Sequence, residues 1–375
     1  MAEQRQRKTT GAPAKKVSAK QREAKKKKKV VIFAIELIII LVMLAVLYLV
    51  MNKTSEGPKV TYLEPDKLEI HEEVQENVTM KGYMNVALFG VDAQTESQLY
   101  KGSRSDSIMI ASINMDTGDI KLVSVYRDTY LNIGTDSYQK CNAAYSYGGA
   151  EQAVKMLNMN LDMDITDFVT VGYKGLSEVI DGLGGVYIDV DSEELKHINN
   201  YQYGIAGVLK CDYTKVTDTG YQLLDGLQAT AYCRIRYTKG DDFKRASRQR
   251  EVLMAIEEQA KKADAATLVK VFNDAIGDIY TSIDSDTILE LIKNIGNYRI
   301  VGEDGFPQAD MRTVATIGKV DGHNAVGSSV IPLDLEANVV WLHQFLFDDE
   351  DYTVTDSVRE YSQKVETNSA PFIRK

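Results

Sequence analysis

A basic stretch over residues 234–250 contains the side chains whose types and spacing are best suited to chemistry. Seven Lys or Arg residues fall within these seventeen positions. Arg234 and Arg236 are two residues apart, so an extended backbone would point both side chains the same way. The helix predicted next carries three polar side chains at helical spacing on one face, namely Arg245, Arg248 and Gln249. Two converging sets of guanidinium groups suit a ligand with several anionic oxygens, such as a pyrophosphate.

The alternative is a surface network in which these bases pair with nearby acids. Asp241 or Asp242 is placed to cap the predicted helix, which fits either interpretation. Residues 30–375 carry 32 basic against 52 acidic side chains, so concentrated positive charge stands out there and favours ligand binding. The same acidic balance argues against general nucleic-acid binding by the folded part of the chain.

Two carboxylates lie beside predicted strand ends, where open α/β sheets tend to bind ligands. Asp92 and Asp106 could hold Mg²⁺ (or Mn²⁺), which takes few protein ligands together with waters and substrate phosphates. Alternatively, Asp92 caps a turn and Asp106 pairs with Arg104. Arg127 directly follows another predicted strand and is either a further anion contact or a partner of Asp128.

The cysteines and histidines do not form a recognisable reactive group in the sequence. Three cysteines are too few for a disulfide framework, and four scattered histidines make a zinc site improbable. Cys233 adjoins Arg234, but a buried thiol that fills space is the preferred interpretation. His197 and His343 are interpreted as ordinary surface or core-edge residues.

The elements that must position these residues alternate between strands and helices along the chain. Strands are predicted over 85–90, 107–114, 120–126, 168–173 and 186–190, with the second and third forming a hairpin. Four helices are predicted with both bounds, over about 150–158 and over 266–276, 286–295 and 335–346. Three more are predicted with one bound each: a short helix that ends near 182, a helix that begins at 226, and a longer helix that ends at about 262. This order indicates an α/β fold, an α-β-α sandwich in which helices flank a mixed central β-sheet.

The ends of the chain differ in composition from the middle. Residues 1–29 are rich in lysine and are predicted to be a disordered basic tail. Residues 30–51 are apolar except for Glu36 and are long enough for a transmembrane helix, too long for the core of a signal peptide. The preceding lysines predict a cytoplasmic N-terminus and an extracellular C-terminal domain. The remaining boundaries are predicted as a stalk over 52–80, a catalytic domain over 81–350 and a tail over 351–375.

Several motifs together resemble the LytR-CpsA-Psr family of membrane-anchored cell-wall glycopolymer transferases. Their order and spacing match over about residues 85–255. The motifs are Leu88-Phe-Gly-Val-Asp92, Arg104-Ser-Asp-Ser-Ile-Met109, Ser124-Val-Tyr-Arg-Asp-Thr-Tyr130, Asn142-Ala-Ala-Tyr-Ser-Tyr-Gly-Gly149, Val179-Ile-Asp-Gly-Leu-Gly-Gly-Val186, Leu224-Asp-Gly-Leu-Gln-Ala-Thr-Ala-Tyr232 and the basic stretch. One departure is Tyr126, because the family usually has proline before this Arg-Asp pair.

The resemblance implies a Mg²⁺-dependent phosphotransferase at the outer side of the membrane. It would move a teichoic acid or capsular polysaccharide from an undecaprenyl-pyrophosphate carrier to peptidoglycan. Asp92 and Asp106 would hold the metal, and Asp242 or Asp128 are candidates for the general base. The pyrophosphate would be bound by Arg127, Arg234, Arg236, Arg245 and Gln249, with Arg248 as a neighbour. Two alternatives remain, a hydrolase acting on the same lipid and a regulator that binds polyprenyl phosphates without catalysis.

Overall fold

The computed structural model describes residues 59–93, 97–320 and 324–373 of the 375-residue chain. The predicted tail over 1–29 and the predicted transmembrane helix over 30–51 lie outside the described residues. None of the helices within the described ranges is long and apolar enough to cross a membrane. The described residues form one compact unit.

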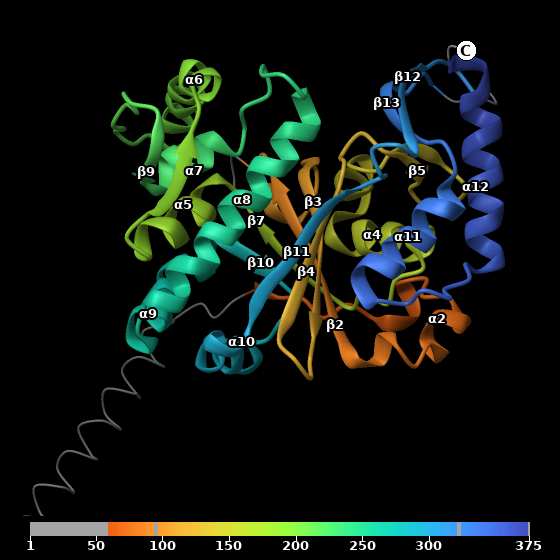
Figure 1. The fold of residues 1–375 in the computed structure, drawn as a ribbon, viewed down its shortest axis with the longest axis horizontal. Coiled ribbons are helices and arrows are strands. Elements are labelled where there is room, and N and C mark those ends of the chain that lie inside the picture. Colours follow the sequence, from red (N-terminus) through yellow and green to blue (C-terminus); the bar gives the residue numbers. More distant parts are fainter. Residues whose placement is uncertain (1–58, 94–96, 321–323, 374–375) are drawn as a thin grey trace, which may run out of the picture. The chain divides into compact units, whose positions relative to one another are not determined.

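A seven-stranded mixed sheet runs through the centre of this unit, in the order β1-β10-β7-β2-β3-β4-β11 (Figure 1). The predicted mixed sheet and the predicted hairpin of β3 and β4 are therefore confirmed. The strands are β1 (Lys59–Val60), β2 (Tyr83–Val91), β3 (Ser105–Asn114), β4 (Asp119–Val125), β7 (Asp167–Val171), β10 (Ile279–Thr281) and β11 (Arg299–Phe306).

The directions of the strands bring distant parts of the sequence to one edge of the sheet. Strand β3 is antiparallel to both β2 and β4, so it begins where its two neighbours end. Strand β7 runs parallel to β2 and pairs Val171 with Gly90 near that same edge. The residues that follow β2, open β3, follow β4 and follow β7 are consequently neighbours in space, although β2 ends at Val91 and β7 ends only at Val171.

Helices cover both faces of the sheet, as the sandwich prediction required. On one side lie α4 (Ala143–Leu161), α11 (Leu335–Phe347) and α12 (Asp356–Ser369), which share the main hydrophobic core with the sheet (Figure 1). On the other side lie α5 (Tyr173–Gly182), α7 (Gly226–Tyr232), α8 (Asp241–Lys262) and α9 (Ala265–Ala275). Shorter elements are α2 (Glu72–Glu76), α3 (Ser97–Tyr100), α10 (Ser285–Lys293), β5 (Tyr130–Asn132), β6 (Tyr138–Lys140), β12 (Arg312–Ile317) and β13 (Gly327–Pro332).

A second hydrophobic core lies on the α5–α8 side. It is built by these helices together with α6 (Ser192–Leu209) and the antiparallel pair β8 (Val186–Val190) and β9 (Gly220–Leu224). Helix α6 was not predicted, but its start carries a clear signal. Asp191 caps the helix, and Glu194 returns a hydrogen bond to the backbone of Asp191, which completes a capping box. The same arrangement of Asp225 and Gln228 starts α7.

The predicted boundaries at both ends of the domain are wrong in the described residues. The segment predicted as a stalk over 52–80 joins the domain from Lys59 onward, where β1 pairs with β10 and three side chains enter the main core, those of Leu68, Val74 and Met80. The predicted tail over 351–375 contains α12, whose Val358 and Val365 are buried in the same core. Both segments are polar on average, but sparse apolar side chains suffice to fix a helix or strand against an existing core.

A candidate active-site cavity

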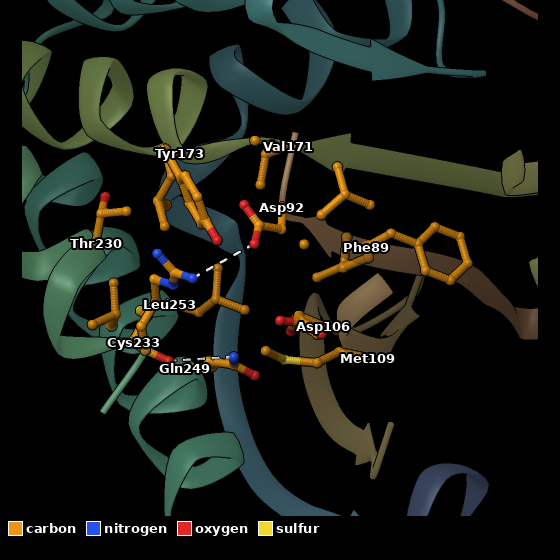
Figure 2. Close-up of a pocket in the computed structure, with 18 of the residues that line it drawn as sticks. Phe89, Asp92, Asp106, Met109, Val171, Tyr173, Thr230, Cys233, Gln249 and Leu253 are labelled. Carbon is orange, nitrogen blue, oxygen red and sulfur yellow. Dashed lines mark hydrogen bonds and ion pairs between the residues drawn. The ribbon is translucent and has the colours of Figure 1, made fainter. Parts of the chain in front are cut away.

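A cavity of about 610 Å³ opens between the edge of the sheet and helices α5, α7 and α8 (Figure 2). It brings together every predicted metal and pyrophosphate ligand except Arg248. The charged and amide side chains that line it are Asp92, Asp106, Arg127, Arg234, Arg236, Arg245 and Gln249. Four guanidinium groups against two carboxylates leave an excess of positive charge, which favours an anionic ligand.

Asp106 and Arg127 face each other at the edge of the sheet. Arg127 Nη1 donates to Asp106 Oδ1 at 2.7 Å, and Arg236 Nη2 lies 3.3 Å from Asp106 Oδ2. Burial raises the pKa of Asp106, but Arg127, Arg245 and Arg236 outweigh it and hold this pKa below its usual value. The backbone carbonyl of Arg127 accepts from the N–H of Asn142 at 3.1 Å, which ties the start of α4 to the residues after β4. Asp106 thus pairs with arginines of the cavity. The alternative interpretation from the sequence, in which Asp106 pairs with Arg104, is not what the structure shows.

Helix α8 contributes a carboxylate that lies among three of the arginines. Asp242 is 3.0 Å from Arg245 Nη2, 3.4 Å from Arg127 Nε and 3.9 Å from Arg236 Nε. The helix begins at Asp241 behind Gly240, so neither aspartate caps it through its side chain, contrary to expectation. Asp242 instead gathers the guanidinium groups around one point.

Arg245 has unsatisfied hydrogen-bonding capacity in the cavity wall. Its side chain is 4% exposed, and Nη2 donates to the backbone carbonyl of Asp106 at 3.1 Å. Its Nε is buried without a hydrogen-bond partner among the described residues. Burial lowers the pKa of Arg245 to about 10, and Asp242 only partly opposes this effect. Arg245 thus places a buried cation in the cavity wall, where an anionic ligand would offset the cost of its burial.

The segment that carries Arg234 and Arg236 is a turn-rich loop between α7 and α8, not the extended strand that was expected. Hydrogen bonds from Arg234 N to Ala231 O and from Ile235 N to Tyr232 O close successive turns. Both arginines nevertheless line the cavity, because the tight loop carries each guanidinium to the same opening.

Tyr173, at the start of α5, is a site residue that the sequence did not reveal. The guanidinium carbon of Arg234 lies 4.4 Å from the centre of its ring, and Arg234 Nη2 is 3.6 Å from Asp92 Oδ2. Figure 2 shows Tyr173 beside Asp92, with the dashed ion pair between Asp92 and the arginine. Burial raises the pKa of Tyr173, so the phenol is protonated at neutral pH and can donate. The sequence signal that could have identified Tyr173 is its position just after β7, because open α/β sheets bind ligands beyond the carboxyl ends of their strands.

Arg248 is the one predicted ligand that the structure places elsewhere. Its side chain is 0% exposed and points into the second core, where Nε donates to Glu194 Oε1 at 2.8 Å. Gln249, one residue later, lines the cavity and donates weakly to the carbonyl of Cys233 at 3.4 Å. The helical spacing predicted that Arg248 and Gln249 share one face of the helix. Adjacent positions of a helix point about 100° apart, so Gln249 faces the cavity while Arg248 faces the second core.

Two further side chains considered in the sequence, Cys233 and His343, behave as space-filling groups. Cys233 lines the cavity, but burial raises the pKa of its thiol to about 12, which leaves it protonated and unreactive. His343 is fully buried on α11, stacked on Tyr352 with ring centres 3.5 Å apart, so it is a core residue and not a surface one. Tyr126, the departure from the family pattern, packs edge-on against Phe243 and ties the end of β4 to the start of α8.

The cavity also has an apolar wall. Side chains from the sheet and from two helices line it without charged groups, namely Leu88, Val91, Met109, Val169, Val171, Leu176, Val179, Val252, Leu253, Ile256 and Ile279. A small polar substrate would leave this wall exposed to water at a cost of roughly 25 cal/mol per Å². The cavity is therefore matched to an amphipathic ligand that combines an anionic group with a hydrocarbon chain.

Magnesium fits the donors present, although no cluster of three or more His, Cys, Asp or Glu suited to a metal occurs in the described ranges. Asp92 and Asp106 line the same cavity, and both offer oxygen, the donor that Mg²⁺ prefers. Two carboxylates are few, but Mg²⁺ ordinarily completes its shell with waters and phosphate oxygens.

Solved structures of similar fold include several bacterial proteins. TagV of Bacillus subtilis aligns with a TM-score of 0.54 at 24% identity, covering 73% of this chain and 99% of that one. A protein called a transcriptional regulator from Enterococcus faecalis aligns with a TM-score of 0.57 at 22% identity, covering 80% of this chain and 99% of that one. At these identities the likeness shows the fold.

Curated relatives are named polyisoprenyl-teichoic acid–peptidoglycan teichoic acid transferase TagU. The Enterococcus faecalis protein is 29% identical over 57% of this chain and 65% of its own length. The Oceanobacillus iheyensis protein is 27% identical over 71% of this chain and 80% of its own length. A model of the LytR_cpsA_psr family matches residues 46–320, and the chain belongs to that family.

Proposed function

We propose that this protein transfers an anionic glycopolymer from a polyprenyl-pyrophosphate carrier to peptidoglycan. The observation that carries the proposal is the joining of four guanidinium groups and an apolar wall within a single cavity. A lipid with a pyrophosphate headgroup likewise combines an anionic group with a hydrocarbon chain. The names of the curated relatives support the transferase reaction and the teichoic acid class, and a capsular polysaccharide is a further candidate.

In this proposal the arginines bind and orient the pyrophosphate. Arg127, Arg236 and Arg245 lie around Asp242, while Arg234 and Gln249 close the cavity from the loop side and from α8. Held by fixed donors, the two phosphates are aligned for attack without reorganisation of solvent. The same donors stabilise the charge that grows on the leaving phosphate, which is the main protein contribution in phosphoryl transfer.

The reaction exchanges one phosphorus–oxygen bond for another. A hydroxyl of the peptidoglycan sugar attacks the phosphorus that carries the glycopolymer, and the bond to the bridging oxygen breaks. Polyprenyl monophosphate leaves with the bonding electrons, and the hydroxyl proton passes to a base. Both oxygens of Asp242 are engaged by guanidinium groups. We therefore propose Asp242 as the residue that positions the arginines, in place of a general base.

The proposal includes a divalent metal and a membrane anchor. Asp92 and Asp106 would hold Mg²⁺ or Mn²⁺, which when bound neutralises phosphate charge. Residues 30–51 would anchor the chain with its N-terminus in the cytoplasm, which places the folded domain outside, beside its lipid and its acceptor. A tag after Lys375 that can be reached only in permeabilised cells would refute this orientation.

The decisive experiment combines full-length protein in detergent with lipid-linked glycopolymer, a peptidoglycan oligomer and Mg²⁺. Mass spectrometry should detect the glycopolymer–peptidoglycan conjugate together with polyprenyl monophosphate, and EDTA should suppress both. Monophosphate and free phosphorylated glycopolymer without conjugate would identify a hydrolase. Binding of the lipid with no turnover under any condition would identify a regulator and refute the transferase proposal.

A further inference from the structure

The loop between α7 and α8, residues 233–240, carries both Arg234 and Arg236 at the mouth of the cavity. Their side chains are only about a third exposed, yet the loop has no strand pairing that would fix its backbone. A flexible loop would spread the two guanidinium groups over many positions, and ordering it on binding would weaken ligand affinity. Short turns close parts of the loop, and contacts from outside it fix the loop against the rest of the domain.

Arg248 holds this loop with two of its three side-chain nitrogens. Nη1 donates to the carbonyl of Ile235 at 3.0 Å, and Nη2 donates to Thr238 Oγ1 at 2.7 Å. Ile235 is the residue between the two cavity arginines, and its side chain is 0% exposed in the second core. A single buried guanidinium thus fixes the backbone at the centre and at the far end of the loop.

Glu194 fixes Arg248 in turn. Its Oε1 accepts from Arg248 Nε at 2.8 Å, while Oε2 accepts from the backbone N–H of Asp191 at the start of α6. Glu194 is 1% exposed, and the hydroxyl of Tyr232 lies 3.2 Å from Oε1. The chain of contacts runs from a capped helix end through one buried ion pair to the loop. Each group in it is satisfied, which is the condition under which a buried polar network adds rigidity.

We infer that Arg248 and Glu194 are positioning residues, which hold the loop so that Arg234 and Arg236 face the pyrophosphate before it binds. The inference rests on the proposed function, since it deepens the account of the same cavity. It replaces the sequence-based expectation that Arg248 contacts the ligand itself. Arrangement in advance lowers the cost of binding, because the loop does not need to be ordered by the ligand.

The first test compares Arg248→Lys with a matched control, Arg250→Lys. Lysine keeps the charge opposite Glu194 but cannot reach Ile235 and Thr238 as a fork can. Arg250 is also a buried arginine of α8, but it pairs with Glu303 and Ser124 and contacts no residue of the loop. The melting temperatures of the full-length proteins in detergent are measured first. Polyprenyl pyrophosphate is then titrated into fresh, folded protein at a temperature well below both melting temperatures. We expect binding to weaken about tenfold or more in Arg248→Lys and to stay unchanged in Arg250→Lys.

The second test separates positioning from direct contact with the ligand. Thr238→Val removes one anchor of the loop while leaving Arg248 and every cavity charge in place. A positioning role predicts weaker binding of polyprenyl pyrophosphate in this variant. A direct contact between Arg248 and the ligand predicts unchanged binding. Adding Arg248→Lys to a variant that already carries Arg234→Ala and Arg236→Ala should weaken binding little further. The loop of that variant no longer carries a guanidinium group that its position could bring to the ligand.

The outcomes keep the two proposals apart. If wild-type protein does not bind polyprenyl pyrophosphate, the proposed function fails. If wild type binds it, but folded Arg248→Lys and Thr238→Val bind it equally well, the positioning role is refuted and the proposed function stands. Equal weakening in Arg248→Lys and Arg250→Lys would show a general loss of helix stability and would also refute the positioning role.

Discussion

Arg127 Nη1 donates to Asp106 Oδ1 at 2.7 Å, although the two residues are separated by 21 positions and lie at the ends of different strands. In this pair the proposed phosphate ligand Arg127 and the proposed metal ligand Asp106 neutralise each other. A pyrophosphate bound with Mg²⁺ would give each group a new partner of the opposite charge. In the proposed function, the pair would hold both side chains in place for the ligand.

Asp106→Asn tests this arrangement, because asparagine preserves the shape of the side chain and removes its charge. We expect transfer to fall at least tenfold and Mn²⁺ affinity, measured by titration calorimetry, to fall with it. The domain should stay folded, since the side chain is 29% exposed. Asp119→Asn is the control, because Asp119 is similarly exposed, pairs with Arg299 at the start of β4 and does not line the cavity. Normal metal affinity in Asp106→Asn would remove this residue from the metal site.

The sheet edge could be predicted from the sequence because each motif there follows or opens a strand. Asp92, Asp106 and Arg127 are adjacent to strands with strong apolar patterns, and antiparallel pairing brings such ends together. Glu194 and Tyr173 could not be predicted as partners of the site, since only tertiary packing brings them to Arg248 and Arg234.

Elements with weak patterns were missed for a different reason. Helix α12 has a polar sequence in which Val358 and Val365, seven positions apart, carry the buried face. Strand β11 contains two glycines and two acids and alternates weakly, yet it pairs with β4 along its length. Both depend on a surface that exists only once the rest of the domain has folded, which local sequence does not encode.

The apolar wall should determine affinity for the lipid and not for the headgroup. Leu253 lines that wall on α8, and Leu253→Asn would place an amide against hydrocarbon. We expect the KM for a long-chain lipid donor to rise about tenfold or more, since burial of a leucine is worth about 1.5–3 kcal/mol. A water-soluble donor with a very short chain should be affected much less. Leu223→Asn, on the exposed face of β9, is the control. Equal effects on both donors would contradict a lipid-binding wall.

The buried His343 predicts how stability depends on pH. Burial lowers its pKa to about 4, below the ordinary value of 6.5, so the unfolded chain binds more protons between these limits. The contribution of His343 to stability is complete above about pH 6.5 and is lost as pH falls to about 4, by about 3 kcal/mol. His343→Phe should remove this part of the slope in urea unfolding followed by the fluorescence of Trp341, the single tryptophan. Val339→Ala, a core truncation on the same helix, should keep it. An unchanged slope in His343→Phe would refute the assignment.

Arg234 and Arg236 test whether the geometry of the guanidinium groups matters beyond their charge. Replacement of either by alanine removes a charge-assisted contact worth about 1.5–3 kcal/mol, so transfer should fall roughly tenfold to a hundredfold. Replacement by lysine should restore little, because an ammonium group retains the charge without the planar fork. Both side chains are partly exposed, with ion pairs to Asp92 and Asp106 at 3.6 and 3.3 Å. A mere surface network would therefore contribute at most about 1 kcal/mol to stability and nothing to activity.

The measurement compares transfer rates of the two lysine variants and the two alanine variants with Lys261→Ala. Lys261 lies near the end of α8, where it pairs with Glu257 four residues earlier and does not line the cavity. Wild-type rates in both lysine variants would refute the requirement for a fork and leave charge alone as the requirement. Wild-type rates in the alanine variants as well would reduce the basic stretch to a surface network. The expected order, with the lysine variants close to the alanine variants and far below Lys261→Ala, would show that the loop binds pyrophosphate by paired, directed hydrogen bonds.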